Sequence, residues 1–386
     1  MGGDLLRREN LKLMYNIVRK QRFITVLLVL CVSIFTVNAG DERPLRSAEP
    51  KPQSGVSGYS PNVNYGVFNF DGCALLTKVS LENPLTMKYI AYYSSPAGIA
   101  YLNTVLERGN IYMPFIREEI EKRNLPLELL YLPVIESGFQ ITAKSKSGAV
   151  GLWQFMMNSI SPFGIKVNDY IDERRDFVKS TKGALQKLED NYKVLGNWEL
   201  AIAAYNCGLG QITRTIQKTK ISDFWELAQK KEIRQETEQY VPKLIAITYI
   251  LSQPRRFGIN VWHKPFEWVA ILLKRQVSLD ILAEEAGIER DLLRRLNAEL
   301  LHGITMQDNS RQLIVPVVHY ENVSRVLERE DLKLLRFSYH TVSKGDTLWG
   351  ISRLYGTSLD LIEQYNPGIS NRYLRIGETV VIPSLN

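Results

Sequence analysis

The sequence of 386 residues predicts a mostly α-helical protein that closes with small modules of two strands and two helices. Apolar residues recur at helical spacing through the middle of the chain, as at Leu102, Leu106 and Ile120. Runs typical of strands appear late, at 339–342 and 379–382. Hydrophobic residues make up 45% of the chain and charged residues 23%, which indicates packed domains rather than disorder.

The first 39 residues are predicted to be a signal peptide or an N-terminal anchor. Basic residues within 19–22 precede the apolar run 23–37. That run is shorter than the ~20 residues of a membrane-spanning helix, and small residues ending at Ala39 suit signal-peptidase cleavage. Export to the periplasm with cleavage near Ala39 is favoured, while a retained, membrane-associated anchor and lipidation at Cys31 stay open.

Residues 40–75 are predicted to be a flexible linker. The stretch 40–64 is rich in Pro, Gly and Ser, a composition typical of a tether. A trimmed or disordered leader without a role is the alternative.

Residues 76–262 are predicted to form one helical domain around Glu136. This acid ends the apolar run Leu130–Ile135 and is followed by a Ser and a Gly. Burial against apolar side chains raises the pKa of a carboxyl group. A carboxyl that stays protonated near neutral pH can donate a proton to a leaving oxygen, as cleavage of a glycosidic bond requires. An ordinary glutamate on the polar face of a helix is the alternative.

Two prolines bear on the helix that leads to Glu136. Pro126 suits its first turn, whereas Pro133 is expected to lie in the helix interior and to kink it. Further helices are predicted at 179–192, 198–206 and 237–251.

Four motifs follow one another in this domain. Together they closely resemble the lytic transglycosylases, lysozyme-like enzymes that cleave bacterial peptidoglycan, and most of all the membrane-bound lytic murein transglycosylase D-like group. The resemblance implies a lysozyme-like α-helical catalytic domain. The motifs are Glu136-Ser137, Gly151-Leu152-Trp153-Gln154-Phe155, Ala204-Tyr205-Asn206 and Glu236-Thr237 with Tyr240-Val241-Pro242.

The resemblance implies that Glu136 is the catalytic residue, first as an acid and then as a base toward the muramoyl 6-hydroxyl. The product would be a 1,6-anhydro sugar formed without water. A glycosidase that hydrolyses its substrate uses two carboxylates. No second acid follows Glu136 before Lys166, and the charged residues at 169–176 are expected to lie on the surface.

The resemblance also implies a set of substrate-binding residues. Gln154 and Asn206 offer amides to sugar N-acetyl or hydroxyl groups, and Ser137 orients nearby polar groups or the peptide stem. The aromatic residues offer flat surfaces for sugar rings, with core packing as the alternative, and Tyr240 is also placed to hydrogen-bond Glu136. The set is Ser137, Trp153, Gln154, Tyr205, Asn206 and Tyr240.

Residues 338–384 carry a second family signature. A strand-like run at 339–342 leads into the turn Lys344-Gly345-Asp346, and a helix follows. This resembles a LysM module, a βααβ domain that binds glycans containing N-acetylglucosamine. The residues implied in glycan binding are Asp346, Thr347, Leu348, Asn366, Pro367 and Ile369.

Residues 263–317 repeat this pattern in a degenerate form. Ser278 aligns with Thr347, and Asn297 aligns with Asn366. The Gly-Asp-Thr turn is missing, so this LysM-like module is expected either to bind glycan or to serve as a packed spacer. Residues 318–337 are predicted to be a linker.

The distribution of charge and of His residues indicates which partners and cofactors to expect. The net charge of +7 is scattered and no nucleic-acid motif is present, so peptidoglycan with its acidic stems is a fitting partner and a solvated surface is the alternative. The four His residues show no metal-ligand spacing, so we expect no metal and no cofactor. Whether Cys73 and Cys207 pair stays open.

The sequence is compatible with three functions. The first is a lytic transglycosylase targeted to the wall by LysM, which would remodel the cell wall. The second is a hydrolytic muramidase on the same fold, and the third is a non-catalytic wall-binding protein. The intact set of Glu136-Ser137, Gln154 and Tyr205-Asn206 argues against the third.

Overall fold

The computed structural model describes most of the chain from residue 73 onward, together with a short strand before it. The predicted signal peptide or anchor, with Cys31 and Ala39, and most of the predicted linker lie outside the described residues. Within the described part, no helix combines the length and apolar character needed to cross a membrane. The described residues are 56–59, 73–168, 171–260, 265–275, 277–301, 303–305, 312–332, 334, 337–355, 359–369 and 374–383.

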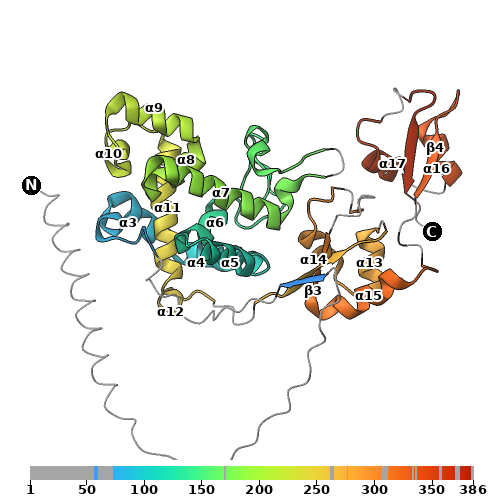
Figure 1. Ribbon diagram of the computed structural model, residues 1–386, viewed down its shortest axis with the longest axis horizontal. Coiled ribbons are helices and arrows are strands. Elements are labelled where there is room, and N and C mark those ends of the chain that lie inside the picture. The colour runs from blue at the N-terminus through green and yellow to red at the C-terminus, as the bar shows by residue number, and fades with distance from the viewer. Residues whose placement is uncertain are drawn as a thin grey trace, which may run out of the picture. The chain divides into compact units, whose positions relative to one another are not determined.

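The first domain is a bundle of helices (Figure 1). The helices predicted at 179–192, 198–206 and 237–251 are present, and the fold class is confirmed as mostly α-helical. Its elements are α2 (Lys78–Glu82), α3 (Pro84–Tyr93), α4 (Pro96–Gly109), α5 (Met113–Lys122), η2 (Leu127–Tyr131), α6 (Leu132–Glu136), η3 (Met157–Ser159), η4 (Ser161–Phe163), η5 (Glu173–Arg175), α7 (Phe177–Leu195), α8 (Trp198–Cys207), α9 (Leu209–Thr219), α10 (Phe224–Gln229), α11 (Gln235–Leu251) and α12 (Pro254–Phe257).

Helix α11 is the centre of this bundle and packs against α3, α6 and α8. Its residues Leu244, Ile245 and Ile247 are completely buried. Ala203 and Ala204 of α8 are also completely buried, and their small side chains allow α8 to approach its neighbours closely. This packing brings the side chains of α8 and α11 next to the end of α6.

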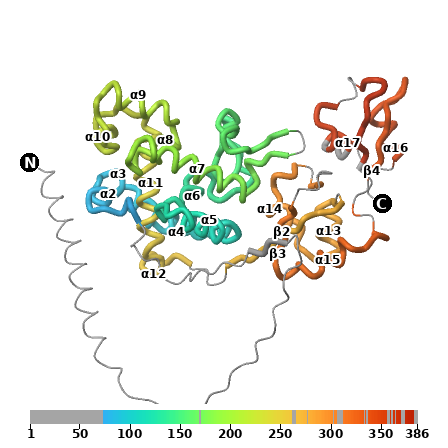
Figure 2. The backbone as a smooth tube through the Cα atoms, viewed as in Figure 1, coloured from blue at the N-terminus to red at the C-terminus, as the bar shows by residue number. Residues whose placement is uncertain are grey.

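The LysM-like module is larger than the sequence predicted. Val323 and Val326 of α15 are buried in its core, so the prediction of a linker at 318–337 was wrong. The predicted linker at 40–75 likewise contributes β1, which pairs antiparallel with β2. In chain order the module contains β2 (Trp268–Leu272), α13 (Leu279–Ala286), α14 (Arg290–Leu296), β3 (Gln312–Pro316), η6 (Val317–His319) and α15 (Tyr320–Glu328), with β1 (Val56–Tyr59) completing the sheet in the order β1-β2-β3. Figure 2 labels β2, α13, α14, β3 and α15.

Strand β2 of the LysM-like module also contributes side chains to the core of the helical domain. The indole ring of Trp268 packs edge-on against Phe115 and Phe177, with ring centroids 5.9 and 5.5 Å apart. The backbone N–H of Asp172 also donates to the carbonyl oxygen of Glu299 at 2.9 Å. The module is therefore fixed to the helical domain by both apolar packing and backbone bonds.

The C-terminal module has the predicted βααβ order. Its two strands pair antiparallel, with Tyr339 opposite Val381. Leu348, Ile351 and Ile362 fill its small core. Its elements are β4 (Phe337–Thr341), α16 (Leu348–Tyr355), α17 (Leu359–Tyr365) and β5 (Thr379–Pro383).

One asparagine joins helix to strand in each module. Asn366 donates to the carbonyl oxygens of Ile362 and Val381 at 2.7 Å each, and it accepts from the N–H of Val381 at 2.8 Å. Asn297 makes the same bonds to Leu293 and Ile314, at 3.0, 2.8 and 2.9 Å. The sequence alignment of Asn297 with Asn366 is thereby confirmed, and both side chains serve the fold.

Candidate active site

Glu136 is the last residue of a short helix and precedes a sharp turn. Helix α6 spans only Leu132–Glu136. The backbone then takes positive φ angles of 58° at Gly138 and 56° at Phe139, which no right-handed helix allows. The guanidinium of Arg108 donates to the Gly138 carbonyl oxygen at 2.8 Å and holds this turn in place.

Pro133 does not interrupt a helix. The segment that was predicted to be one helix from Pro126 onward consists of the 3₁₀ helix η2 followed by α6. Pro133 lies in the first turn of α6, where a missing N–H breaks no intrahelical bond. The expectation of a kink at an interior proline was therefore wrong.

Ser137 connects the Glu136 turn to the Gly-Leu-Trp-Gln segment. Its Oγ donates to the carbonyl oxygen of Leu152 at 2.9 Å, and the residue is only 8% exposed. The hydroxyl thus binds the backbone of the Gly-Leu-Trp-Gln segment, which agrees with the first of its two expected roles, the orientation of nearby polar groups. Ser137 thereby positions the segment that carries Glu136.

A buried ion pair supports the Gly-Leu-Trp-Gln segment from behind. Asp172 accepts from Arg174 Nε at 2.9 Å and from Nη2 at 2.7 Å, and the side chains are 6% and 10% exposed. Arg174 Nη1 also donates to the carbonyl oxygen of Gly148 at 3.2 Å. A Cβ atom on Gly151 would lie 2.0 Å from the Arg174 carbonyl oxygen, so only glycine fits there.

The charged stretch 169–176 was expected to lie on the surface, and this expectation was wrong for its centre. Asp172, Glu173 and Arg174 are 4%, 2% and 8% exposed. Their burial is tolerated because each charge is paired. Asp172 pairs with Arg174, and Glu173 forms an ion pair with Lys179 at 2.6 Å.

Trp153 belongs to the hydrophobic core. It is fully buried, and its indole N–H donates to Thr181 Oγ1 at 3.0 Å. The side chain therefore offers no surface to a sugar ring, which corrects one of the predicted binding roles. Tyr205 is also buried, at 6% exposure, and its hydroxyl donates to the Trp153 carbonyl oxygen at 2.8 Å.

The two predicted amide residues remain accessible. Gln154 is half-buried and has a positive φ of 48°. Its Nε2 donates to the Gly151 carbonyl oxygen at 2.8 Å, so its Oε1 is the remaining acceptor. Asn206 is half-buried as well, and its Oδ1 accepts from Thr237 Oγ1 at 2.8 Å. Its Nδ2 group is the remaining donor.

The hydroxyl of Tyr240 donates to Glu136 Oε1, and this confirms the contact predicted from the sequence. Tyr240 comes from α11 and Glu136 from α6, so the packing of these two helices brings the pair together. The bond fixes the orientation of the carboxyl group.

Burial raises the pKa of Glu136 from its ordinary value of 4.5 to about 7. The hydrogen bond from Tyr240 and the positive charge of Lys187 act in the opposite direction. Glu236 raises this pKa further, but it is the weakest of these causes and is itself exposed. At neutral pH both the protonated and the ionised form of Glu136 are therefore populated.

Lys187 is a site residue that the sequence analysis missed. Its ammonium lies over the ring of Tyr205 at 4.4 Å from the centroid, and burial lowers its pKa while Glu136 raises it. The signal was available, because Lys187 falls on α7 between the buried residues Ala184 and Leu188. A lysine in an apolar stripe at helical spacing indicates a charge directed inward.

The cysteines and metal-ligating side chains of the described residues form neither a disulfide bond nor a metal site. Cys73 and Cys207 are both free thiols. Within the described ranges, no group of three or more His, Cys, Asp and Glu side chains could hold a metal ion.

In the C-terminal module, part of the predicted glycan-binding set belongs to the scaffold. Leu348 is completely buried and Asn366 is occupied by backbone bonds, so neither is available to a ligand. Asp346 accepts from the Ser343 N–H and contacts His340 Nε2, both at 2.7 Å. Thr347 and Pro367 are exposed.

The module has a further exposed group next to this set. Ile369 is half-buried against the core, whereas the indole of Trp349 is 61% exposed. The guanidinium of Arg353 lies over that indole, 4.9 Å from the ring centroid. Trp349 was not among the predicted binding residues.

Comparison with known proteins identifies each region. The transglycosylase SLT domain family matches residues 113–228, the LysM-like domain of lytic transglycosylase MltD matches 267–331, and the LysM domain matches 340–383. A solved structure of an inactive mutant of lytic transglycosylase Slt from Pseudomonas aeruginosa is 24% identical. It covers 39% of this chain and 25% of that chain with a TM-score of 0.31, a similarity too low to support an argument about the fold.

Two curated relatives extend over most of the chain. Membrane-bound lytic murein transglycosylase D of Escherichia coli (strain K12) is 30% identical over 301 residues, which are 73% of this chain and 66% of that protein. The protein of the same name from Escherichia coli O6:H1 matches with the same values. The chain thus spans slightly less than two thirds of the length of these relatives. It belongs to the MltD-like lytic transglycosylases, with an SLT domain followed by a LysM-like module and a LysM module.

Proposed function

We propose that this protein is a peptidoglycan lytic transglycosylase. It would cleave the β-1,4 bond between N-acetylmuramic acid and N-acetylglucosamine and leave 1,6-anhydro-N-acetylmuramic acid ends. The observation that carries the proposal is the state of Glu136, whose pKa of about 7 and bond from Tyr240 suit a single group that donates and then accepts a proton.

The proposed reaction has two proton transfers through Glu136. The carboxyl group first gives its proton to the glycosidic oxygen as the bond from that oxygen to the anomeric carbon breaks. The carboxylate then takes the proton of the muramoyl 6-hydroxyl while that oxygen bonds to the anomeric carbon. Glu136 is protonated again at the end, and no water is consumed.

The groups around Glu136 would hold the sugars in place. Gln154 Oε1 and Asn206 Nδ2 are the amide atoms available to N-acetyl and hydroxyl groups, because their other amide atoms are engaged within the protein. Tyr240 would keep the carboxyl oriented, and Tyr205 with Lys187 would form one wall of the site.

We also propose that the C-terminal LysM module binds N-acetylglucosamine units and so keeps the enzyme on the wall. The exposed Thr347 and Pro367, with Ile369 and Trp349, would form that surface. Export to the periplasm, with or without a retained membrane anchor, fits a peptidoglycan substrate and the predicted N-terminal signal. The two relatives from Escherichia coli are named as membrane-bound proteins.

The products formed from purified sacculi test the proposed activity. Mass spectrometry is expected to find muropeptides that end in 1,6-anhydro-N-acetylmuramic acid. Reducing N-acetylmuramic acid ends would instead show a hydrolytic muramidase. Tight binding to sacculi without release of muropeptides would show a wall-binding protein.

Replacement of Lys187 by methionine is expected to move the basic limb of the pH–rate profile to higher pH. The ammonium lowers the pKa of Glu136, so its removal raises that pKa and keeps the acid protonated over a wider range. The measurement is kcat/KM for anhydro-muropeptide release between pH 5 and pH 9. Lys182→Met, an exposed change on the same helix, is the control, and a Lys187→Met profile that overlays the wild type would contradict the assignment.

A further inference from the structure

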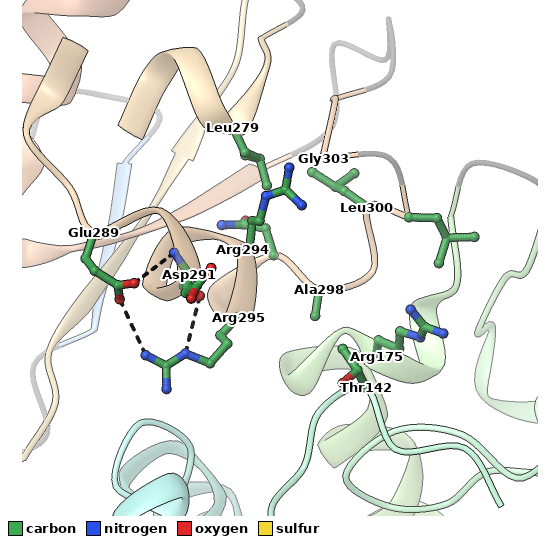
Figure 3. A pocket seen from close by; sticks show the side chains of 12 residues that line it. Thr142, Arg175, Leu279, Glu289, Asp291, Arg294, Arg295, Ala298, Leu300 and Gly303 are labelled. Atoms are coloured by element: carbon green, nitrogen blue, oxygen red, sulfur yellow. Dashed lines mark hydrogen bonds and ion pairs between the residues drawn. The ribbon is translucent and has the colours of Figure 1, made fainter. Parts of the chain in front are cut away.

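A pocket of about 500 Å³ lies where the helical domain meets the LysM-like module (Figure 3). Thr142 and Arg175 line it from the helical domain, while Arg294 and Arg295 of α14 line it from the module. Both regions belong to one compact unit, residues 52–386. The pocket is therefore a feature of the joined domains and not of either alone.

The two arginines of the module side are paired within the protein, whereas the carboxylate of Asp291, which also lines the pocket, forms no ion pair with any residue in the described ranges. Arg294 donates to both carboxylate oxygens of Asp280, at 2.8 and 2.6 Å. Arg295 lies 3.6 Å from Glu289, and Figure 3 shows this contact as a dashed line. Glu289 also caps α14, since it accepts from the backbone N–H groups of Asp291 and Leu292. These side chains hold one another and form the wall of the pocket.

Arg175 is the exception among the cations that line the pocket. Its Nε is buried and has no hydrogen-bond partner, and its guanidinium forms no ion pair with any residue in the described ranges. Its backbone is fixed, because its N–H donates to the Asp172 carbonyl oxygen at 3.0 Å. Arg175 therefore brings to the pocket a guanidinium charge that has no partner within the described ranges and that an external anion would satisfy.

We propose that this pocket is a subsite for a carboxylate carried by the muramoyl substituent of peptidoglycan, bound by the Arg175 guanidinium. The planar guanidinium matches a carboxylate with two parallel hydrogen bonds. Thr142, which also lines the pocket, adds a hydroxyl donor. The inference rests on the proposed function, because that function supplies a substrate with carboxylates on its stem peptides.

Residues of the pocket lie close in the chain to residues of the active site. Thr142 lies on the segment that follows Glu136, and Arg175 follows Arg174, which holds the Gly-Leu-Trp-Gln segment. The proposal also gives the LysM-like module a role without the Gly-Asp-Thr turn, since α14 closes the subsite. Carboxylate binding would then select which muramoyl units reach Glu136.

Three substrates prepared from the same sacculi test the subsite. The first is glycan strands with intact stem peptides, the second is the same strands with stem carboxylates converted to amides, and the third is strands stripped of stems, which keep only the lactyl carboxylate. For the wild type, KM for the amidated strands is expected to be about tenfold higher than for the intact strands. In strands with intact stems the lactyl carboxyl group is an amide that carries the stem, so only stem carboxylates can produce this difference. A low KM for the stripped strands would show that the subsite also accepts a free lactyl carboxylate, and a high one would show that it requires the stem carboxylates.

Arg175→Gln is expected to reduce this tenfold ratio to about one, and Arg175→Lys to keep part of it because the charge remains. Arg255→Gln, which removes one exposed Arg charge elsewhere, is the matched control and should keep the wild-type ratio. A wild-type ratio near one, or an unchanged ratio in Arg175→Gln with the same melting temperature, would overturn the subsite. Absence of turnover on all three substrates would instead overturn the proposed function.

Discussion

Replacement of Glu136 by glutamine is expected to lower the release of anhydro-muropeptides by about a thousandfold or more. Glutamine keeps the shape and can still accept the hydrogen bond from Tyr240, but it can neither give nor take a proton. General acid–base groups contribute about 10²–10⁴-fold each, and here one group serves both steps. The measurement is kcat on soluble glycan strands by mass spectrometry. Glu226→Gln, an exposed acid paired with Lys230, should retain activity.

The same variant should show an altered dependence of stability on pH. The pKa of Glu136 is raised from 4.5 to about 7 in the folded protein, so the folded state binds more protons than the unfolded state between these values. The wild type therefore loses stability as the pH rises through this window, by at most about 3 kcal/mol. The side chain of glutamine does not titrate, so the Glu136→Gln variant should be the more stable protein at pH 8 and no more stable at pH 4. Thermal unfolding of both proteins at the two pH values measures the difference.

Asp172→Asn is expected to destabilise the helical domain by about 3–5 kcal/mol. Asparagine removes the negative charge that Arg174 needs at 10% side-chain exposure, and a buried charge without its partner is strongly unfavourable. The loss should also loosen the Gly-Leu-Trp-Gln segment that Arg174 supports. Urea denaturation followed by tryptophan fluorescence gives the change in the free energy of unfolding.

Asp190→Asn is the matched control for this variant. Asp190 pairs with Lys193 at 3.2 Å, but the two side chains are 52% and 68% exposed. Exposed ion pairs contribute about 0–1 kcal/mol, so this change should lie within about 0.5 kcal/mol of the wild type. Equal effects of the two substitutions would show that breaking the Asp172–Arg174 pair leaves no uncompensated charge.

The sequence predicted the elements of this protein well where local patterns decide them. The helices around Ala204 and Ile245 and the βααβ order of the C-terminal module follow from apolar spacing and turn residues. The alignment of Asn297 with Asn366 even anticipated a shared set of hydrogen bonds. Pro133 was misplaced because a change from a 3₁₀ helix to an α-helix leaves no clear mark in the sequence.

The orientation of individual side chains in the site was harder to predict from the sequence. Ser137 and Trp153 lie in the right segments, but they face a carbonyl oxygen and a threonine hydroxyl that sequence order does not bring near. Asp172 was expected on the surface because its burial depends on Arg174, and pairing is visible only in three dimensions. Lys187 was missed for the opposite reason, since its inward place on α7 could have been read from its spacing.

The asparagine that joins helix to strand in both small modules separates architecture from recognition. Because Asn297 and Asn366 saturate their amides on the main chain, the residues that would meet a sugar can change without loss of the scaffold. The LysM-like module can therefore accept a binding turn taken from the C-terminal module. Grafting the Ser343–Thr347 turn ahead of α13 should create a second carbohydrate receptor and give the enzyme bivalent retention on its polymer.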